Sequence, residues 1–86
     1  MSQTAVTYRI KLFAAAKQLA GRGEIEIELA RGASVGTLRA AIVAHYPELT
    51  SLVKAGRIAA GASYVDDSTL LDPSAELALI PPVSGG

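Results

Sequence analysis

Residues 24–46 read EIEIELARGASVGTLRAAIVAHY, and this stretch decides the fold. Its first six residues alternate glutamate with an aliphatic residue, which predicts a half-buried strand because successive side chains of a strand point to opposite faces. Ser34 suits the N-cap of a helix that we predict over residues 35–46 and that Pro47 ends. The apolar face of this helix consists of Val35, Leu38, Ile42 and Tyr46. A strand and a helix with one apolar face each predict a two-layer packing.

The segments before this stretch extend the pattern. Residues 4–13 alternate as a strand would, and the apolar face of that strand consists of Val6, Tyr8, Ile10 and Leu12. Residues 14–20 are rich in good helix formers and are followed by Gly21, a residue type that often ends helices. Such a short helix is stable only when it packs against the rest of the domain.

The segments after the main helix are short. We predict a turn of helix (49–54), two short strands (57–60 and 62–65), two turns (66–68 and 72–74) and a last strand (75–80). Leu70 and Leu71, between the two turns, are expected to anchor their loop onto the core. One amphipathic helix cannot cover both faces of a sheet, so the sequence predicts an α+β domain over residues 1–80. In this domain a mixed sheet of four to five strands has one main helix packed across it.

The amino-acid composition excludes several classes of protein and of functional site. Half of the 86 residues are hydrophobic and fewer than a fifth are charged, which excludes a disordered chain. Eight basic and eight acidic residues give a formal net charge of zero, so binding of nucleic acid over a broad basic surface is not expected. There is no cysteine, hence no disulfide and no thiolate to act as nucleophile or metal ligand. With no signal-peptide pattern and no apolar run of membrane-spanning length, we expect a cytoplasmic protein.

The side chains offer no recognisable active site. His45 is the only histidine, and without a second histidine or a cysteine we expect it to be a packing residue at the edge of the core and not a metal ligand. Asp66 and Asp67 adjoin each other in a turn signal, where we expect both carboxylates to be solvated. A single histidine cannot give the serines the partners of a catalytic triad. We therefore predict no bound metal and no bound cofactor.

The last six residues, Pro81-Pro82-Val83-Ser84-Gly85-Gly86, are predicted to form an extended and flexible tail. The two prolines end the last strand, since neither can donate a ladder hydrogen bond, and they favour an extended start to the tail. The two glycines have no side chains, so this end is thin enough to thread a narrow channel. The main-chain carboxylate of Gly86 is then the one uncrowded reactive group on the chain. The alternative interpretation is an inert, frayed terminus.

The ending Pro-Pro-Val-Ser-Gly-Gly after an apolar strand resembles the C-terminus of the molybdopterin synthase small-subunit family, whose members are ubiquitin-like β-grasp sulfur carriers related to the thiamine sulfur carrier. Residues 13–21, FAAAKQLAG, resemble the family's segment after its first strand, and the order of helices and strands agrees with a β-grasp. The resemblance covers nearly the whole chain. The chain departs from the family at Ala60-Gly61, Ser74-Ala75 and Leu79-Ile80, where members often have an asparagine, Gly-Asp and aromatic residues, respectively.

The resemblance implies a sulfur carrier that is not catalytic alone. A ubiquitin-activating-type enzyme would use ATP to adenylate Gly86, and sulfur from a persulfide would displace AMP to leave a thiocarboxylate. The tail would then insert into the large synthase subunit, which holds the pterin precursor and supplies the catalytic side chains, to deliver sulfur for the molybdopterin dithiolene. By the same resemblance, the complex would be a heterotetramer of two small and two large subunits.

The resemblance also implies roles for particular residues. Gly86 would carry the sulfur, and Gly85 would let the tail thread. The residues that would line the opening of the partner's channel are Pro81, Pro82, Val83 and Ser84. Phe13, Leu79 and Ile80 are candidates for the docking surface, although each of them suits a core position as well.

Two other functions are kept open. The same fold serves sulfur carriers for thiamine, cysteine or tRNA thiolation and ubiquitin-like protein modifiers, all of which would also use Gly86. A β-grasp interaction module with an inert tail would not use it. Transfer of sulfur to Gly86 separates the carriers from the module, and co-purification of a large synthase subunit separates the molybdopterin carrier from the other carriers.

Overall fold

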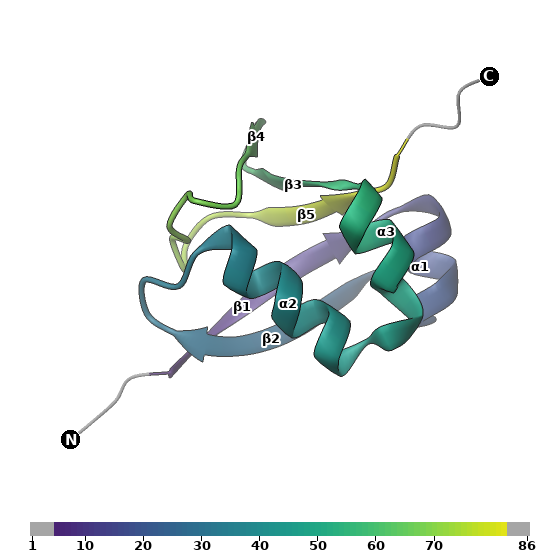
Figure 1. The fold of residues 1–86 in the computed structure, drawn as a ribbon, viewed down its shortest axis with the longest axis horizontal. Helices are drawn as coiled ribbons and strands as arrows, with labels where there is room; N and C mark the ends of the chain where they lie inside the picture. The colour runs from purple at the N-terminus through teal and green to yellow at the C-terminus, as the bar shows by residue number, and fades with distance from the viewer. Residues whose placement is uncertain (1–4, 83–86) are drawn as a thin grey trace.

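A computed structural model describes residues 5–82, which form a five-stranded sheet with helices packed against it (Figure 1). The strands are β1 (Ala5–Leu12), β2 (Glu24–Ala30), β3 (Arg57–Ala60), β4 (Ser63–Val65) and β5 (Leu77–Ile80). Their order across the sheet is β2-β1-β5-β3-β4, in which β1 and β5 are parallel and all other neighbours are antiparallel. The sheet is therefore mixed, as predicted, and the last strand in the chain lies at its centre.

The first two strands confirm the alternation in the sequence. They pair in antiparallel register from Ala5 opposite Ala30 to Lys11 opposite Glu24. Five inward-facing residues of this pair are buried, namely Tyr8, Ile10, Leu12, Ile25 and Ile27, and the facing pair of Val6 and Leu29 is half-buried against the core. The three glutamates of β2 alternate with them and are exposed on the other face of the sheet.

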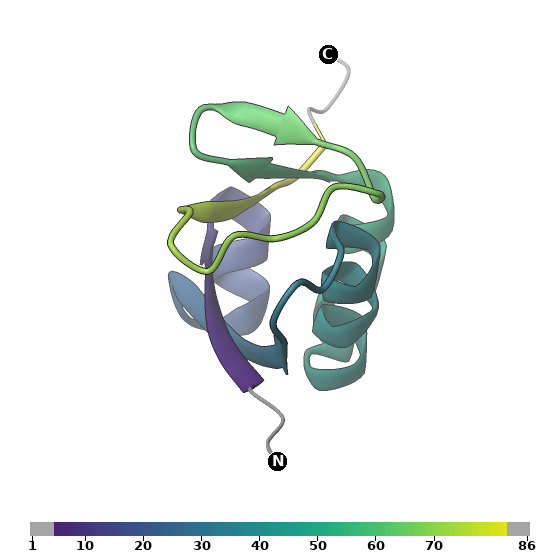
Figure 2. The same ribbon diagram turned by 90° about the vertical axis from the view of Figure 1, so that its left-hand side faces the viewer.

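Helix α2 (Val35–His45) packs across one face of the sheet and forms the second layer (Figures 1 and 2). Ser34 is its N-cap, as predicted, because the Ser34 Oγ accepts a hydrogen bond of 3.2 Å from a backbone N–H of the first turn. The helix ends at His45, one residue before the predicted end. Tyr46 has already left the helical region, with φ −133° and ψ 70°, since the residue before a proline disfavours helical angles and Pro47 follows.

Three shorter helical segments complete the helical layer. They are α1 (Ala14–Ala20), the 3-10 turn η1 (Pro47–Leu49) and α3 (Thr50–Ala55). Gly21 ends α1 with a left-handed φ of 73°, a conformation that glycine adopts at little cost. No helix within residues 5–82 is long and apolar enough to cross a membrane.

The hydrophobic core lies between the helices and the inner face of the sheet. Its buried members are Tyr8, Ile10, Leu12, Ala16, Ile25, Ile27, Val35, Leu38, Ile42, Leu49, Val53, Ile58, Leu71, Leu77 and Leu79. Of the two residues predicted to anchor the loop before β5, only Leu71 does so, because Leu71 is buried whereas Leu70 is 67% exposed. Backbone hydrogen bonds hold this loop to the start of α2, from Val35 N–H to Thr69 O (2.9 Å) and from Leu71 N–H to Ala33 O (2.8 Å).

The last strand is shorter at its start than predicted. Residues 72–75 form a turn, in which the Ala75 N–H donates to Asp72 O at 3.0 Å and the Ser74 N–H donates to Asp72 Oδ1 at 2.9 Å. The strand therefore begins at Leu77 and not at Ala75. It ends at Ile80, which is also the last residue of the domain predicted over residues 1–80.

Candidate functional site

The candidate site is the end of β5, where the chain leaves the sheet. β5 is paired with β1 on one side and with β3 on the other, so Ile80 is the last residue of a strand held on both edges. Pro81 is half-buried and Pro82 is exposed, and neither belongs to a strand. Residues 83–86 lie outside the described residues, so the flexibility of the tail and the roles of Val83, Ser84, Gly85 and Gly86 stay predictions.

An apolar surface adjoins this exit on the face of the sheet opposite α2. We call it the open-face patch, and it consists of Phe13, Ala59, Tyr64, Ala78 and Ile80. Ala59 lies opposite both Tyr64 and Ala78 in the neighbouring strands. Phe13 follows Leu12, which pairs with Leu79, so the alternation of the strand places Phe13 on this face next to Ile80.

The two aromatic residues of the patch are open to a partner. Phe13 is 47% exposed and Tyr64 is 55% exposed, and together with the half-buried residues between them they extend the apolar surface across several strands. The Arg57 guanidinium carbon lies 4.4 Å from the centre of the Tyr64 ring, within the range of a cation–π interaction. This contact orients the ring of Tyr64 at the edge of the patch.

The three residues predicted to dock a partner divide between the two faces of the sheet. Phe13 and Ile80 belong to the open-face patch, where Phe13 is exposed and Ile80 is half-buried. Leu79 is fully buried, so the prediction that it contributes to docking is wrong. It lies between Ala78 and Ile80 in an extended strand, and its side chain therefore points to the opposite face, into the core. Tyr64 was not predicted, because its place beside Ala59 depends on a strand register that local sequence does not give.

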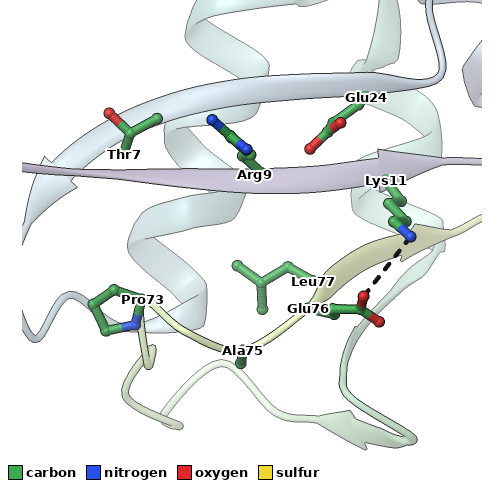
Figure 3. Close-up of a pocket in the computed structure, with 8 residues that line it drawn as sticks. All are labelled: Thr7, Arg9, Lys11, Glu24, Pro73, Ala75, Glu76 and Leu77. Carbon is green, nitrogen blue, oxygen red and sulfur yellow. Dashed lines mark ion pairs between the residues drawn. The ribbon is translucent and has the colours of Figure 1, made fainter.

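The other end of the same face is polar (Figure 3). A shallow pocket there is lined by Thr7, Arg9, Lys11, Glu24, Pro73, Ala75, Glu76 and Leu77. Lys11 Nζ lies 3.9 Å from Glu76 Oε2, and Arg9 Nε lies 3.3 Å from Glu26 Oε2. All four side chains are more than half exposed, so these ion pairs contribute little to stability. The balanced charge favours no charged ligand, and no group of acidic residues or histidines within residues 5–82 is arranged to hold a metal ion.

The acidic residues of the two turns have structural partners. Asp66 Oδ1 accepts hydrogen bonds from Ser68 Oγ at 2.8 Å and from Thr69 Oγ1 at 3.0 Å. These bonds, with that of Ser68 the strongest, lower the pKa of the Asp66 carboxyl. The Ser74 backbone N–H, followed by the Ser74 hydroxyl, lowers the pKa of Asp72 in the same way. Both carboxylates stabilise turns and are too acidic to donate a proton near neutral pH.

His45 is exposed at the last turn of α2, so the expectation that it packs against the core is wrong. The chain leaves the helix at the next residue, and Tyr46 packs against the core there. Within residues 5–82, the candidate site is therefore the end of β5 together with the open-face patch.

Known proteins share both the sequence and the fold of this chain. A model of the ThiS family matches residues 10–86. The chain belongs to the ThiS family. Among its ThiS-family relatives, a molybdopterin synthase sulfur carrier subunit of Chlamydomonas reinhardtii is 38% identical over 80 residues, which cover 91% of this chain and 96% of that protein. One of the same name from Arabidopsis thaliana is 29% identical over 83 residues, which cover 96% and 86%, respectively.

Solved structures similar to this ThiS-family chain confirm the predicted fold. The small archaeal modifier protein 1 of Haloferax volcanii has a TM-score of 0.79 and 26% identity, and the match covers 91% of this chain and 99% of that one. A Pyrococcus furiosus protein described as subunit 1 of a molybdopterin converting factor has a TM-score of 0.78 and 30% identity, with 91% and 99% covered. The mixed five-stranded sheet with a helix packed across it is thus a ubiquitin-like β-grasp, as the resemblance implied.

Proposed function

We propose that this ThiS-family chain is the sulfur carrier subunit of a molybdopterin synthase in molybdenum cofactor biosynthesis, and that Gly86 carries the sulfur as a thiocarboxylate. The observation that carries the proposal is the junction at Ile80. The central strand of the sheet ends there next to the open-face patch, and the sequence continues directly into Pro-Pro-Val-Ser-Gly-Gly. One partner could therefore bind the patch and receive the chain end. The names of the curated relatives support the same function.

The chemistry at Gly86 would begin from a carboxylate, which is a poor acyl donor. On a ubiquitin-activating-type enzyme, the Gly86 carboxylate would attack the α-phosphorus of ATP and pyrophosphate would leave. The terminal sulfur of a persulfide would then attack the Gly86 carbonyl and expel AMP, and a thiol would cleave the acyl disulfide to leave the thiocarboxylate. The chain supplies only its terminal carboxylate, so ATP belongs to the adenylating enzyme and this chain needs no cofactor of its own.

Delivery of the sulfur would require the large synthase subunit. That subunit would hold the pterin precursor and the catalytic side chains, so the ThiS-family chain would donate sulfur without being catalytic alone. The open-face patch would dock while Pro81, Pro82, Val83, Ser84 and Gly85 pass through the opening of the partner's channel. Two small and two large subunits would form the complex, and two deliveries would complete the dithiolene. The cytoplasmic location stays a prediction, as does the absence of nucleic-acid and membrane partners.

Intact-mass spectrometry tests the proposal directly. The full chain is expressed with its adenylating enzyme and a sulfur donor, and we expect a gain of mass equal to the exchange of one oxygen for one sulfur. A chain that lacks Gly86 serves as the control and should show no gain. If the full chain never gains this mass, Gly86 is not a sulfur carrier.

A protein modifier is the second candidate, and the similarity to small archaeal modifier protein 1 favours it. A modifier would join Gly86 to lysine side chains of other proteins, whereas the proposed carrier would co-purify with a large synthase subunit and form no such adducts. Affinity purification of the tagged chain from its own cells, with denaturing analysis of covalent adducts, separates the two functions.

A further inference from the structure

Gly56 lies where the end of α3 meets the end of β5. Its backbone N–H donates to Leu52 O at 2.7 Å, and the next residue, Arg57, pairs with Ile80. A Cβ atom on Gly56 would lie 2.6 Å from the carbonyl oxygen of Ile80 and 2.6 Å from that of Leu52. Both oxygens belong to backbone, so neither can rotate aside as a side chain would. The φ of Gly56 is −86°, so this position requires glycine because of the close approach and not because of its backbone conformation.

The Ile80 carbonyl group lies directly before the first residue of the tail. Ile80 O belongs to the peptide bond that joins β5 to Pro81. Pro81 has no N–H and cannot extend the ladder of the sheet, and it restricts Ile80 to extended conformations. A Cβ atom at position 56 would overlap the carbonyl oxygen of this peptide bond, so the bond keeps its present orientation only when residue 56 has no side chain.

Arg39, on helix α2, binds backbone carbonyls at the end of α3, including that of Gly56. Its guanidinium donates to the carbonyl oxygen of Val53 and, at 3.2 Å, to that of Gly56. Its Nε lies 2.8 Å from Asp67 Oδ1, and the two atoms form an ion pair without the alignment of a hydrogen bond. Only 21% of the Arg39 side chain is exposed, so its hydrogen bonds to the two carbonyls are partly shielded from water, whereas 68% of the Asp67 side chain is exposed. The planar guanidinium binds two carbonyls at once, which the single ammonium of lysine does less well.

We propose that Gly56 is a positioning residue, which sets the direction in which the tail leaves the sheet. Gly56 does so because it places no side chain against the Ile80–Pro81 peptide bond. Arg39 holds the Gly56 carbonyl in place by a hydrogen bond. The inference rests on the proposed function, because direction matters only if the tail must enter a partner's site. A displacement of the order of 1 Å at a reacting group can cost about 100-fold in rate. Substitution at Gly56 leaves the side chains of the open-face patch unchanged, so docking should persist.

The test measures thiocarboxylate formation at saturating and limiting concentrations of the full chain, with the adenylating enzyme, ATP and a persulfide donor. Gly56→Ala adds a methyl group against Ile80 O. Gly23→Ala is the matched control, because its Cβ would meet only Lys17 Cε at 3.7 Å, an ordinary contact. Ala55→Gly is a second control, which loosens the end of α3 without adding an atom next to Ile80.

We expect Gly56→Ala to lower kcat by about tenfold or more while KM changes by no more than about twofold, because the misplaced tail reacts poorly whereas the side chains available to bind the adenylating enzyme are unchanged. Both controls should keep the wild-type kcat. A folded Gly56→Ala chain with wild-type kcat overturns the proposal, and so does an equal loss of kcat in Ala55→Gly, since the effect would then be one of stability. If Gly56→Ala does not fold, Arg39→Lys is measured in its place. Because lysine holds the Gly56 carbonyl less well, we expect a smaller loss of kcat, and an unchanged kcat overturns the proposal.

A structural measurement keeps this inference separate from the proposed function. If the wild-type chain is never thiocarboxylated, the proposed function fails, and carbon chemical shifts of Ile80 and Pro81 in Gly56→Ala still test the positioning. Shifts that change at these two residues but not in Gly23→Ala support it. Shifts that stay at their wild-type values overturn it.

Discussion

Ala78, Leu79 and Ile80 follow one another in β5, yet they face different surroundings. Ala78 and Ile80 belong to the open-face patch, whereas Leu79 is fully buried beneath the helices. The period of two along a strand separates a residue that stabilises the fold from two residues that are available to a partner. A substitution in the core, at Leu79, and one in the open-face patch, at Tyr64 on β4, should therefore have opposite effects.

Leu79→Ala should reduce the free energy of unfolding by about 2–5 kcal/mol, because it removes buried methyl groups and leaves a cavity. Urea denaturation followed by circular dichroism measures the change. Leu70→Ala is the control, since 67% of Leu70 is exposed and its truncation should change stability by less than about 0.5 kcal/mol. Equal losses in the two variants would contradict the assignment of Leu79 to the core.

Tyr64→Ala should weaken binding to the large synthase subunit by about tenfold or more and leave the unfolding temperature nearly unchanged, because an exposed tyrosine is a frequent binding hot spot. Isothermal titration calorimetry with the purified large subunit measures the affinity. Leu70→Ala serves again as the control, because Leu70 is exposed but does not belong to the open-face patch. Wild-type affinity in Tyr64→Ala would show that the partner does not use this patch.

At the scale of elements, the two acidic turns between β4 and β5 fix the loop that leads into the central strand. Hydrogen bonds in these turns hold the pKa of Asp66 and Asp72 below the ordinary value of 3.8. A carboxyl whose pKa is lower in the folded than in the unfolded chain stabilises the fold at pH values above its unfolded pKa. This contribution is lost as the pH falls through the lower, folded pKa.

The unfolding temperature should therefore fall as the pH is lowered from about 6 to about 2.5. Asp66→Asn should reduce the size of this fall, because asparagine keeps an acceptor oxygen for the Ser68 N–H but does not ionise. Thermal denaturation across this range measures the effect. Glu28→Gln, an exposed carboxylate on β2, is the control and should leave the pH dependence as in the wild type. The same curve for wild type and Asp66→Asn would rule out a stabilising role for this turn.

At the scale of the whole molecule, the fold places the open-face patch beside the residue from which the tail continues. Among residues 5–82 the buried core consists of residues between Tyr8 and Leu79, and the tail is predicted to lie outside it, so we expect changes beyond Pro82 to leave the stability unchanged. One extra residue after Gly86 should abolish thiocarboxylate formation, because the reactive carboxylate would be displaced from its position.

Gly85→Val should strongly reduce thiocarboxylate formation, because a branched side chain would obstruct a narrow channel. Intact-mass spectrometry measures the product, and thermal denaturation should give the wild-type unfolding temperature for both variants.

An equal amount of thiocarboxylate in Gly85→Val and wild type would contradict the narrow channel. Ala44→Val, which introduces a valine at an exposed position of α2 outside the tail and the open-face patch, is the matched control and should be converted as the wild type is.

The sequence alone determined the features that depend on neighbours in the chain. The alternation of residues 24–29, the N-cap at Ser34 and the stop at Pro47 predicted the strand, the start of α2 and, to within one residue, its end. These signals are local, because side-chain direction and capping depend on residues a few positions apart. The resemblance of residues 81–86 to a known family then gave the function that we propose.

The tertiary structure alone decided which distant residues share the site. Tyr64 joins Phe13 and Ile80 through the order and register of the strands, and Gly56 meets Ile80 because α3 ends against β5. Pairing across a sheet is chosen by the burial of the whole core and not by any short segment, so no local pattern specifies it. The periodicity of the sequence therefore determines the strands and helices. The packing of the core determines which residues form the open-face patch and which residues lie next to the end of β5.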